Sequence, residues 1–262
     1  MRALALPVAF VLAALLSGCP GGEGGEKPRT VDHSALTTLL KKYVTDKGLV
    51  DYKTWKEKDL PALDAYLGSL EKVDGEDKLE KKARLALWID AYNAITIRAI
   101  LEFYPLKSIK EKDSQFGFKV WKDYKKTVAG KERSLDEIEN EILRKMGEPR
   151  IHFAINCASL GCPVLRAEAY EAEKLDEQLE DQVRRYMADE SKLKIDAKAK
   201  KVATSRIFDW FGGDFGPTTA DRLEWLASHA KDAGTKGALE DKDAKLEFVD
   251  WDWALNEKAG SN

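Results

Sequence analysis

Residues 85–105 read LALWIDAYNAITIRAILEFYP and carry the strongest helical pattern in the chain. Apolar side chains recur in this stretch at spacings of three and four residues, and Pro105 ends the run. Asp90, Asn93 and Arg98 interrupt it with polar groups, which argues against a helix that spans a lipid bilayer. The pattern therefore predicts a long helix in the core of a globular domain.

Asn93 lies beside the apolar stripe of this helix, next to Tyr92. We therefore expect its side chain to be at least partly buried. A buried amide must find hydrogen-bond partners. Asn93 is thus either a structural clamp or part of a site, and the sequence favours the clamp.

The composition is that of a globular protein with one large domain or two small ones. The chain has 262 residues, of which 44% are hydrophobic and 34% are charged, and its formal net charge is -3. A chain of this length can bury a substantial core. Its near-neutral charge argues against nucleic acid as a partner, because that function normally needs a concentrated basic surface.

The segments around the central helix predict a mixed α+β domain with more helix than strand. Residues 31–43 have helical spacing, and Pro61 suits the first turn of another helix. Two extended pieces surround a turn at Gly130, and a second hairpin is expected to turn near Ala197. We expect one globular domain over residues 31–262 with a small antiparallel sheet, and papain-like or transglutaminase-like folds are the candidate architecture.

A capping box predicts where the helix after the first hairpin begins. Ser134 is a good N-cap residue, and Glu137 follows it three residues later. Glu139 adjoins the apolar stripe of this helix. Its side chain points either into a cleft or into solvent.

Residues 150–163 read RIHFAINCASLGCP and contain two of the three cysteines. Ile151 and Phe153 alternate with other residues in the period-two pattern of a β-strand. A long charged helix is predicted over residues 167–189, and an aromatic, glycine-rich loop over residues 206–216.

The N-terminus has the features of a bacterial lipoprotein signal. An apolar stretch too short for a comfortable membrane-spanning helix precedes the residues LSGC, which resemble a lipobox ending at Cys19. We expect a signal peptide over residues 1–18 and a glycine-rich tether over residues 19–30, with Cys19 lipidated. The alternative is an ordinary cleaved signal with an incidental cysteine. The expected location is the bacterial cell envelope, on a membrane surface outside the cytoplasm.

Five stretches occur in a fixed order between about Tyr43 and Asn256. They read LWIDAYNAITIRAILEFYPLKSI, SLDEIENEILR, PRIHFAINCASLGCPVLRAEAY, IFDWFGGDF and DWDWALN. Together they resemble the domain of unknown function 547 family. The resemblance implies a domain but no established reaction.

The family motifs fall on Trp88, Ile89, Tyr92, Asn93, Glu139, His152, Phe153, Cys157 and Pro163. The chain departs from the pattern at Asp90, where asparagine is expected, and at Arg98 and Asn140, where histidine is common. Plant relatives often carry serine in place of Cys162, so the resemblance implies that Cys162 is dispensable. The missing histidines weaken any scheme in which either is an essential base.

The two cysteines leave three hypotheses open. The first is a cysteine-dependent hydrolase or acyl transferase that uses Cys157, His152 and Asn93 as catalytic residues. The second is a Cys157–Cys162 disulfide that closes the loop between them and adds modest stability; a permanent bond would block the nucleophile. Thiol–disulfide redox through the two cysteines is a separate alternative function. The third is a non-catalytic ligand-binding or envelope-interaction domain, in which Cys157 is only a small buried side chain.

We expect a polar pocket where the central helix meets the 150–163 stretch. Its candidate members are polar residues beside apolar stretches: Asn93, Glu139, His152, Asn156, Cys157 and Arg166, with Asp209 or Asp214 from the aromatic loop. Among them, the predicted binding residues are Glu139, Asn156, Arg166, Asp209 and Asp214.

The expected partners are the membrane, through the lipid anchor, and an unknown small molecule or envelope component. A structural zinc site needs four ligands, and two thiols with one nearby histidine fall short of that number. We therefore expect no bound metal, and no cofactor either.

The lipobox-like residues generate the first prediction. The mature protein should begin at Cys19, with a diacylated side chain that holds it on a membrane. Intact-mass spectrometry of protein purified from bacterial membranes checks the mature N-terminus. A Cys19→Ser variant is the control and should lose the lipid mass, whereas an unmodified start at any other residue contradicts the prediction.

Overall fold

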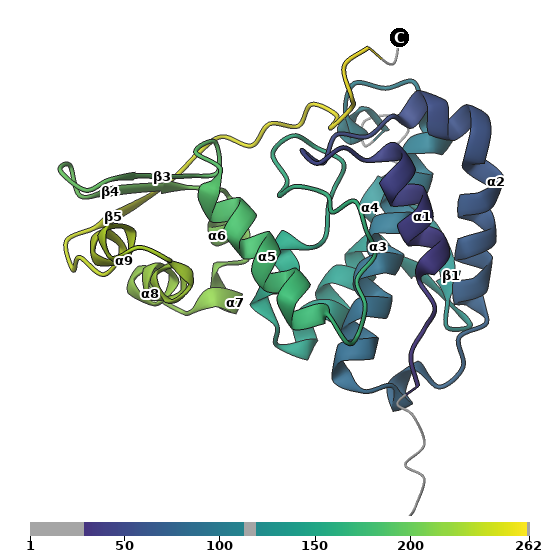
Figure 1. Cartoon of the computed structure of the whole chain (residues 1–262), viewed down its shortest axis with the longest axis horizontal. Helices are drawn as coiled ribbons and strands as arrows, with labels where there is room; N and C mark the ends of the chain where they lie inside the picture. The colour runs from purple at the N-terminus through teal and green to yellow at the C-terminus, as the bar shows by residue number, and fades with distance from the viewer. Residues whose placement is uncertain (1–28, 113–118, 261–262) are drawn as a thin grey trace, which may run out of the picture.

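The computed structural model describes residues 29–112 and 119–260, and Figure 1 shows their arrangement. The predicted signal peptide, Cys19 and most of the tether lie outside the described residues. The described chain is a mixed α+β structure with two small sheets, which confirms the predicted class.

The predicted central helix is confirmed as α3, which runs from Lys81 to Phe103. Every side chain from Leu85 to Leu101 is buried except that of Arg98, which is partly exposed. Helix α2 (Tyr52–Glu71) packs against α3, and α1 (Ser34–Tyr43) packs against α2. A helix enclosed in this way must satisfy its polar side chains with protein partners.

Helix α2 is continuous through the proline that was expected to begin a helix. Its backbone leaves helical geometry at Asp59, two residues before Pro61, and the helix kinks there. The second half of α2 therefore begins where the sequence indicated.

The other helical segments are shorter, and most lie after α3 in the chain. The 3₁₀ segments are η1 (Glu76–Lys78), η2 (Ile109–Lys112), η4 (Arg144–Met146) and η5 (Pro149–Phe153), and η3 (Glu137–Leu143) is a π-helix. The α-helices are α4 (Val120–Asp123), α5 (Leu175–Ala188), α6 (Ile207–Trp210), α7 (Gly212–Phe215), α8 (Thr219–His229) and α9 (Ala233–Leu239).

Both predicted hairpins are confirmed. Strands β1 (Lys125–Val128) and β2 (Lys131–Ser134) pair antiparallel around Gly130, and β3 (Leu193–Asp196) and β4 (Lys201–Thr204) form the second hairpin. The second sheet is not purely antiparallel, because β5 (Lys245–Phe248) pairs parallel to β4.

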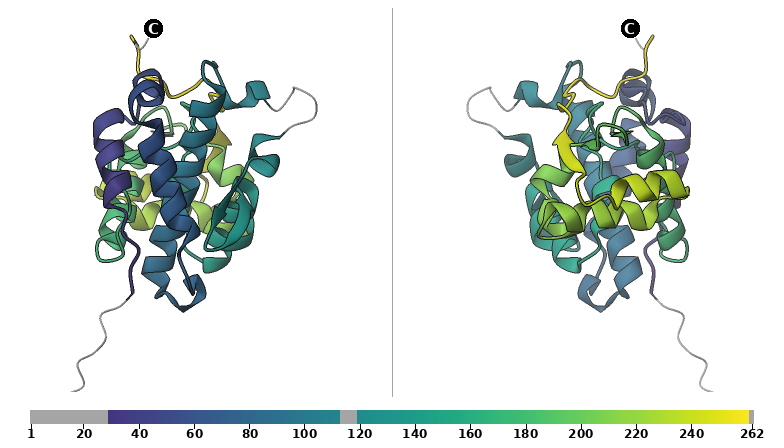
Figure 2. Two further views of the ribbon diagram at one scale, coloured as in Figure 1. Left: turned by 90° about the vertical axis from the view of Figure 1, so that its right-hand side faces the viewer. Right: turned by 90° about the vertical axis from the view of Figure 1, so that its left-hand side faces the viewer.

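Two clusters of buried apolar side chains hold the described chain together. The larger surrounds α1, α2 and α3, and the smaller lies among α5, the second sheet and α6 to α9. In the right-hand view of Figure 2, α8, α9 and β5 lie in front and the α1–α3 layer lies behind. Residues on η5 contribute to both clusters, so this segment lies where the two cores meet.

The strand predicted for the 150–156 stretch is wrong, because the chain forms the 3₁₀ helix η5 there. Glu148 accepts a hydrogen bond from the backbone N–H of Arg150, and Pro149 begins the helix. Ile151 packs in the larger core and Phe153 in the smaller. The apolar alternation therefore arises from a segment between two cores, since both sides of it are buried.

Two further boundaries differ from the sequence prediction. Helix α5 begins at Leu175 rather than near residue 167, because residues 167–174 form turns and irregular chain before it. The aromatic, glycine-rich stretch forms α6 and α7 instead of an irregular loop.

Asn93 is the clamp that the sequence favoured. Its Nδ2 donates to the carbonyl oxygen of Ala154 at 3.0 Å, and its Oδ1 accepts from the N–H of Asn156 at 2.9 Å. The side chain is buried, and it ties the end of η5 to the centre of α3.

An Asn93→Ala variant tests this clamp. It leaves one carbonyl and one N–H group buried without a partner, so unfolding free energy should fall by about 2–4 kcal/mol. Urea denaturation followed by circular dichroism measures the loss, with Thr38→Ala on the exposed face of α1 as a control that should change little. A loss below about 0.5 kcal/mol for Asn93→Ala would show that the clamp is not needed.

Candidate functional site

A cleft of about 240 Å³ opens where η3, η5 and α6 meet two irregular stretches of chain. These are the cysteine loop, residues 157–162, and the C-terminal segment, residues 251–256. Its aromatic walls are Tyr92, Trp121, Trp210, Phe211, Trp251 and Trp253. Its polar side chains are Asp136, Glu139, Asn140 and His152, and the Cys157–Cys162 pair completes the lining. We call it the aromatic cleft.

Four indole rings make a continuous surface in this cleft. The Trp210 ring lies 4.9 Å from that of Trp251 and 6.1 Å from that of Trp253, centre to centre. Trp121 continues the surface at 6.1 Å from Trp253. Trp210 is 45% exposed, so one wall stands open to solvent.

Cys157 and Cys162 form a disulfide, with their Cα atoms 6.4 Å apart. The Cys157 sulfur is therefore not a free thiolate in this structure, and the hypothesis of a cysteine-dependent hydrolase or transferase is not supported. Thiol–disulfide redox would require this bond to open, and that hypothesis stays a prediction. The bond lines the aromatic cleft and closes the turn of the cysteine loop.

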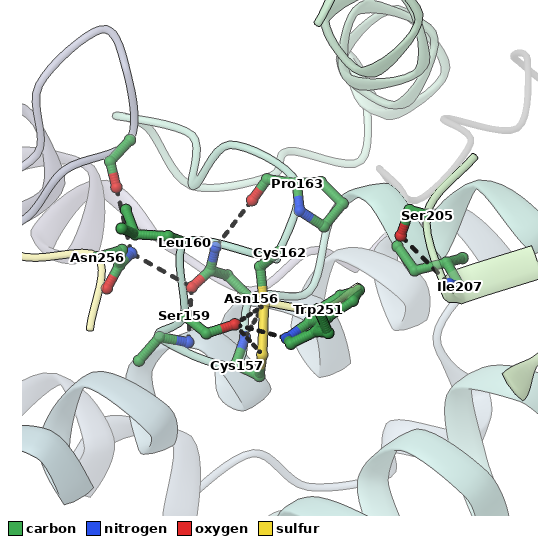
Figure 3. The surroundings of a disulfide bond; sticks show 12 residues. Asn156, Cys157, Ser159, Leu160, Cys162, Pro163, Ser205, Ile207, Trp251 and Asn256 are labelled. Atoms are coloured by element: carbon green, nitrogen blue, oxygen red, sulfur yellow. Dashed lines mark hydrogen bonds between the residues drawn. A yellow bond between two sulfur atoms is a disulfide. The ribbon is translucent and has the colours of Figure 1, made fainter. Parts of the chain in front are cut away.

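Trp251 packs directly against the disulfide loop, as Figure 3 shows. Its Nε1 donates to Ser159 Oγ at 2.9 Å. A Cβ atom on Gly161 would lie 2.7 Å from the Trp251 ring, closer than real contacts allow, so only glycine fits there. The Trp251 indole is therefore hydrogen-bonded to the cysteine loop and closely packed against it.

The C-terminal segment reaches the cleft by pairing with the same loop. Backbone N–H groups of Leu160 and Gly161 donate to the carbonyls of Ala254 and Asp252, at 2.8 and 2.7 Å. These bonds bring Trp251 and Trp253 to the cleft from about 90 residues further along the chain. The DWDWALN motif contains both tryptophans, but no pattern in the sequence assigns it to the site.

Asn156 shapes the loop from behind the cleft. Its Oδ1 accepts from the N–H of Ala158 at 2.8 Å, and its Nδ2 donates to the carbonyl of Pro163 at 2.8 Å. Asn256 also donates to Asn156 Oδ1 at 3.4 Å, which ties in the C-terminal segment (Figure 3). Asn156 is buried and does not line the cleft, so its role here is to hold the loop.

His152 is fixed by a carboxylate and an aromatic ring. Its Nε2 lies 2.8 Å from Asp214 Oδ2, and its ring stacks on Phe211 at 4.3 Å between ring centres. Burial lowers the pKa of His152, and this outweighs the opposing effect of the Asp214 hydrogen bond. The imidazole is therefore neutral at neutral pH.

Asp214 is the charged partner of this network. Arg144 donates to both of its oxygens, from Nε at 2.7 Å and from Nη2 at 2.9 Å. Burial alone would raise the pKa of Asp214, but the hydrogen bonds from His152 and Arg144 outweigh it and lower the pKa. The Arg144–Asp214 pair thus orients the imidazole at the edge of the cleft.

Glu139 is a carboxyl group that lines the cleft without a cationic partner in the described chain. Its Oε2 accepts from the Tyr92 hydroxyl at 3.2 Å, and no ion pair to it occurs among the described residues. Burial raises the pKa of Glu139 to about 7, against the weaker effects of the Tyr92 hydrogen bond and the Arg144 charge. Because its pKa is raised, ionisation of Glu139 destabilises the folded protein as pH rises from about 4.5 through about 7.

The π-helical geometry of η3 helps to place these groups. The capping box is confirmed: Glu137 accepts from the N–H of Ser134, and Ser134 Oγ accepts from the N–H of Glu137. The wider π-helix then presents Glu139 and Asn140 to the cleft, next to its N-cap residue Asp136. Such helices are frequent at functional sites.

The structure brings together only some of the predicted site residues. Glu139, His152 and Cys157 line the cleft, Asp214 supports His152, and Asn93 and Asn156 hold the backbone behind it. Two lie elsewhere: Arg166 pairs with Glu168 and Asp181, and Asp209 pairs with Arg206 at the surface. The chemical roles of these residues stay predictions.

Comparison with known families agrees with the resemblance noted above. Residues 76–187 match the family model described as "Protein of unknown function, DUF547". This match includes α3, η3, η5 and the disulfide loop, but not Trp210, Trp251 or Trp253 of the cleft. No curated protein and no solved structure matches the chain.

Two further observations describe what the folded chain carries. Within residues 29–112 and 119–260, no helix has the length and apolar character to cross a membrane. In the same ranges, no group of three or more histidine, cysteine or carboxylate side chains is placed to hold a metal ion.

The disulfide predicts equal effects from its two cysteines. Cys157→Ser, Cys162→Ser and the double variant should each lose roughly 2 kcal/mol of unfolding free energy, because each change breaks the same short cross-link. Denaturation of the three variants, and of unmodified protein after reduction, measures the effect. If Cys162→Ser is neutral while Cys157→Ser is costly, the dispensable Cys162 implied by the family resemblance is the correct reading.

Proposed function

We propose that this protein is an exported, lipid-anchored domain that binds a small molecule or envelope component in the aromatic cleft. The observation that carries the proposal is the convergence of four tryptophans, a buried carboxyl group and an oriented histidine on one cleft. A concave apolar site with a few convergent polar groups, one of them with a perturbed pKa, is the usual form of a binding site.

The size of the cleft limits the ligand. Sites for drug-sized molecules usually enclose about 300–1,000 Å³, and the aromatic cleft measures about 240 Å³. The ligand, or the part of it that enters the cleft, is therefore small. The exposed Trp210 leaves room for the rest of a larger molecule to lie outside.

Binding without catalysis is favoured by the state of the reactive groups. The Cys157 sulfur is bonded to Cys162, and His152 Nε2 is engaged by Asp214. What remains open in the cleft is aromatic surface and carboxylate oxygen. These groups recognise a ligand without requiring covalent chemistry.

Export is supported by two independent features. The LSGC motif at Cys19 resembles a lipobox, and disulfides persist in oxidising compartments outside the cytoplasm. The glycine-rich residues before the folded body supply a tether between the anchor and the cleft.

Fluorine NMR of protein labelled with 5-fluorotryptophan tests the binding site. Of the seven tryptophans, four line the cleft, whereas Trp55 and Trp88 are buried elsewhere and serve as internal controls. Members of a small-molecule library that bind should shift the cleft resonances and leave those of Trp55 and Trp88 unchanged.

A Trp210→Ala variant should weaken every hit by about fivefold or more, since an aromatic wall contributes about 1 kcal/mol or more of contact. Trp225→Phe, away from the cleft, is the matched control. The proposed function is wrong if no compound in the library shifts the resonance of a cleft tryptophan, or if the compounds that bind shift only the Trp225 resonance.

A further inference from the structure

We propose that the ligand of the aromatic cleft is a small organic cation, recognised through an alkylated or quaternary ammonium group. This inference rests on the proposed function, because it assigns a chemical class to the same site. It follows from the charges and the ring faces in the cleft.

The carboxylates of the cleft lack the cationic partners that two other partly buried carboxylates have. Asp214 is held by Arg144, and Glu148 by Arg150. Asp136 and Glu139, by contrast, form no ion pair with any residue that the structure describes. A carboxylate left in this position attracts a positive charge from outside the protein.

No lysine or arginine is among the cleft-lining side chains in the described part of the chain. Its histidine is neutral, because burial lowers the pKa of His152. The lining of the cleft therefore presents negative charge and π-electron density. Lys110 and Arg144 lie against two of its rings but form no ion pair with Asp136 or Glu139 among the described residues. An anionic ligand would meet repulsion from Glu139.

The ring faces at this site already attract cations within the protein. The Lys110 ammonium lies 4.0 Å from the centre of the Trp253 ring, and the Arg144 guanidinium carbon lies 5.2 Å from that of Phe211. Both distances are within the range of cation–π attraction, for which tryptophan is the best side chain. Lys110 is exposed at the rim and shows that an ammonium group suits this surface.

A neutral sugar is the competing ligand, since aromatic faces and carboxylates also bind sugars. Recognition of several hydroxyl groups needs several free donors and acceptors. In this cleft the Trp251 N–H is already donated to Ser159, and His152 Nε2 is engaged by Asp214. Two of the groups that could orient a sugar are therefore already used, whereas an alkylammonium needs only ring faces and a negative charge.

The protonation of Glu139 gives this inference a pH dependence. The groups that act on Glu139 are Tyr92 from α3, Asp136 and Arg144 along its own helical segment, and Asp214 from α7, while His152 from η5 lines the same cleft. Glu139 is the carboxyl group of the cleft whose pKa is raised to about 7. A cation favours its ionised form, so affinity should rise between pH 6 and pH 8.

The test uses choline chloride and its uncharged isostere 3,3-dimethyl-1-butanol, titrated into the full-length, 5-fluorotryptophan-labelled protein in detergent. At pH 8, choline should bind at least about tenfold more tightly than the alcohol, because only choline carries charge for the carboxylate and the rings. Choline should bind several-fold more weakly at pH 6, whereas the alcohol should show no change.

Glu139→Gln should remove most of the preference for choline and its pH dependence while keeping the shape of the cleft. Glu141→Gln is the matched control, because Glu141 is exposed on the same helix and pairs with Lys145. Equal affinity for choline and the alcohol, or an unchanged preference in Glu139→Gln, overturns the inference.

The outcomes separate this inference from the proposed function. If choline does not bind but library compounds or a neutral disaccharide still shift the resonances of the cleft tryptophans, the cation inference is wrong and the proposed binding function is supported. If no compound shifts these resonances, both proposals are wrong. A folded Glu139→Gln protein is verified by the unchanged resonances of Trp55 and Trp88, which are buried away from the cleft.

Discussion

The site depends most on two hydrogen bonds between the Asn93 side chain and the backbone that follows η5. Asn93 bonds to the carbonyl of Ala154 and to the N–H of Asn156, and both bonds are buried. His152 lies two residues before the first bond, and Cys157 lies one residue after the second. The buried helix α3 thereby fixes the positions of the imidazole and the disulfide, and hence one wall of the cleft.

Three enclosed carboxyl groups show how the protein separates support from recognition. Asp214 is neutralised by Arg144 and orients a neighbour. Asp90 is fully enclosed and accepts the N–H of Tyr170, and burial raises its pKa well above the usual value, so it is a structural group. Glu139 has neither a cation nor complete enclosure, since its side chain lines the cleft. Its Oε2 accepts a hydrogen bond from Tyr92, but no cation in the described chain pairs with it, and for this reason the proposed recognition centres on Glu139.

Sequence patterns predicted the local structure and missed what distant segments build. The central helix, the Gly130 hairpin and the Ser134 capping box were correct because each depends on residues a few positions apart. The 150–156 strand was wrong because a segment buried between two cores shows the same alternation as a strand. Trp251 joins the site through backbone bonds between the loop and the C-terminal segment, and no periodicity encodes that pairing.

The residues that differ from the family pattern or vary within it fall into two groups, those away from the cleft and those that line it. Arg98, where the resemblance implies a common histidine, pairs with Asp64 away from the cleft, so this change leaves the site untouched. Asn140, at the other histidine position, lines the cleft, and its amide cannot exchange a proton as an imidazole does. Cys162, where the resemblance implies serine in plant relatives, bonds the Cys157 sulfur. Asn140 and Cys162 both line the cleft, so this chain lacks an imidazole at the first position and holds the Cys157 sulfur in a disulfide through the second. These are the two places where the cysteine-enzyme hypothesis would draw a base and a free thiolate.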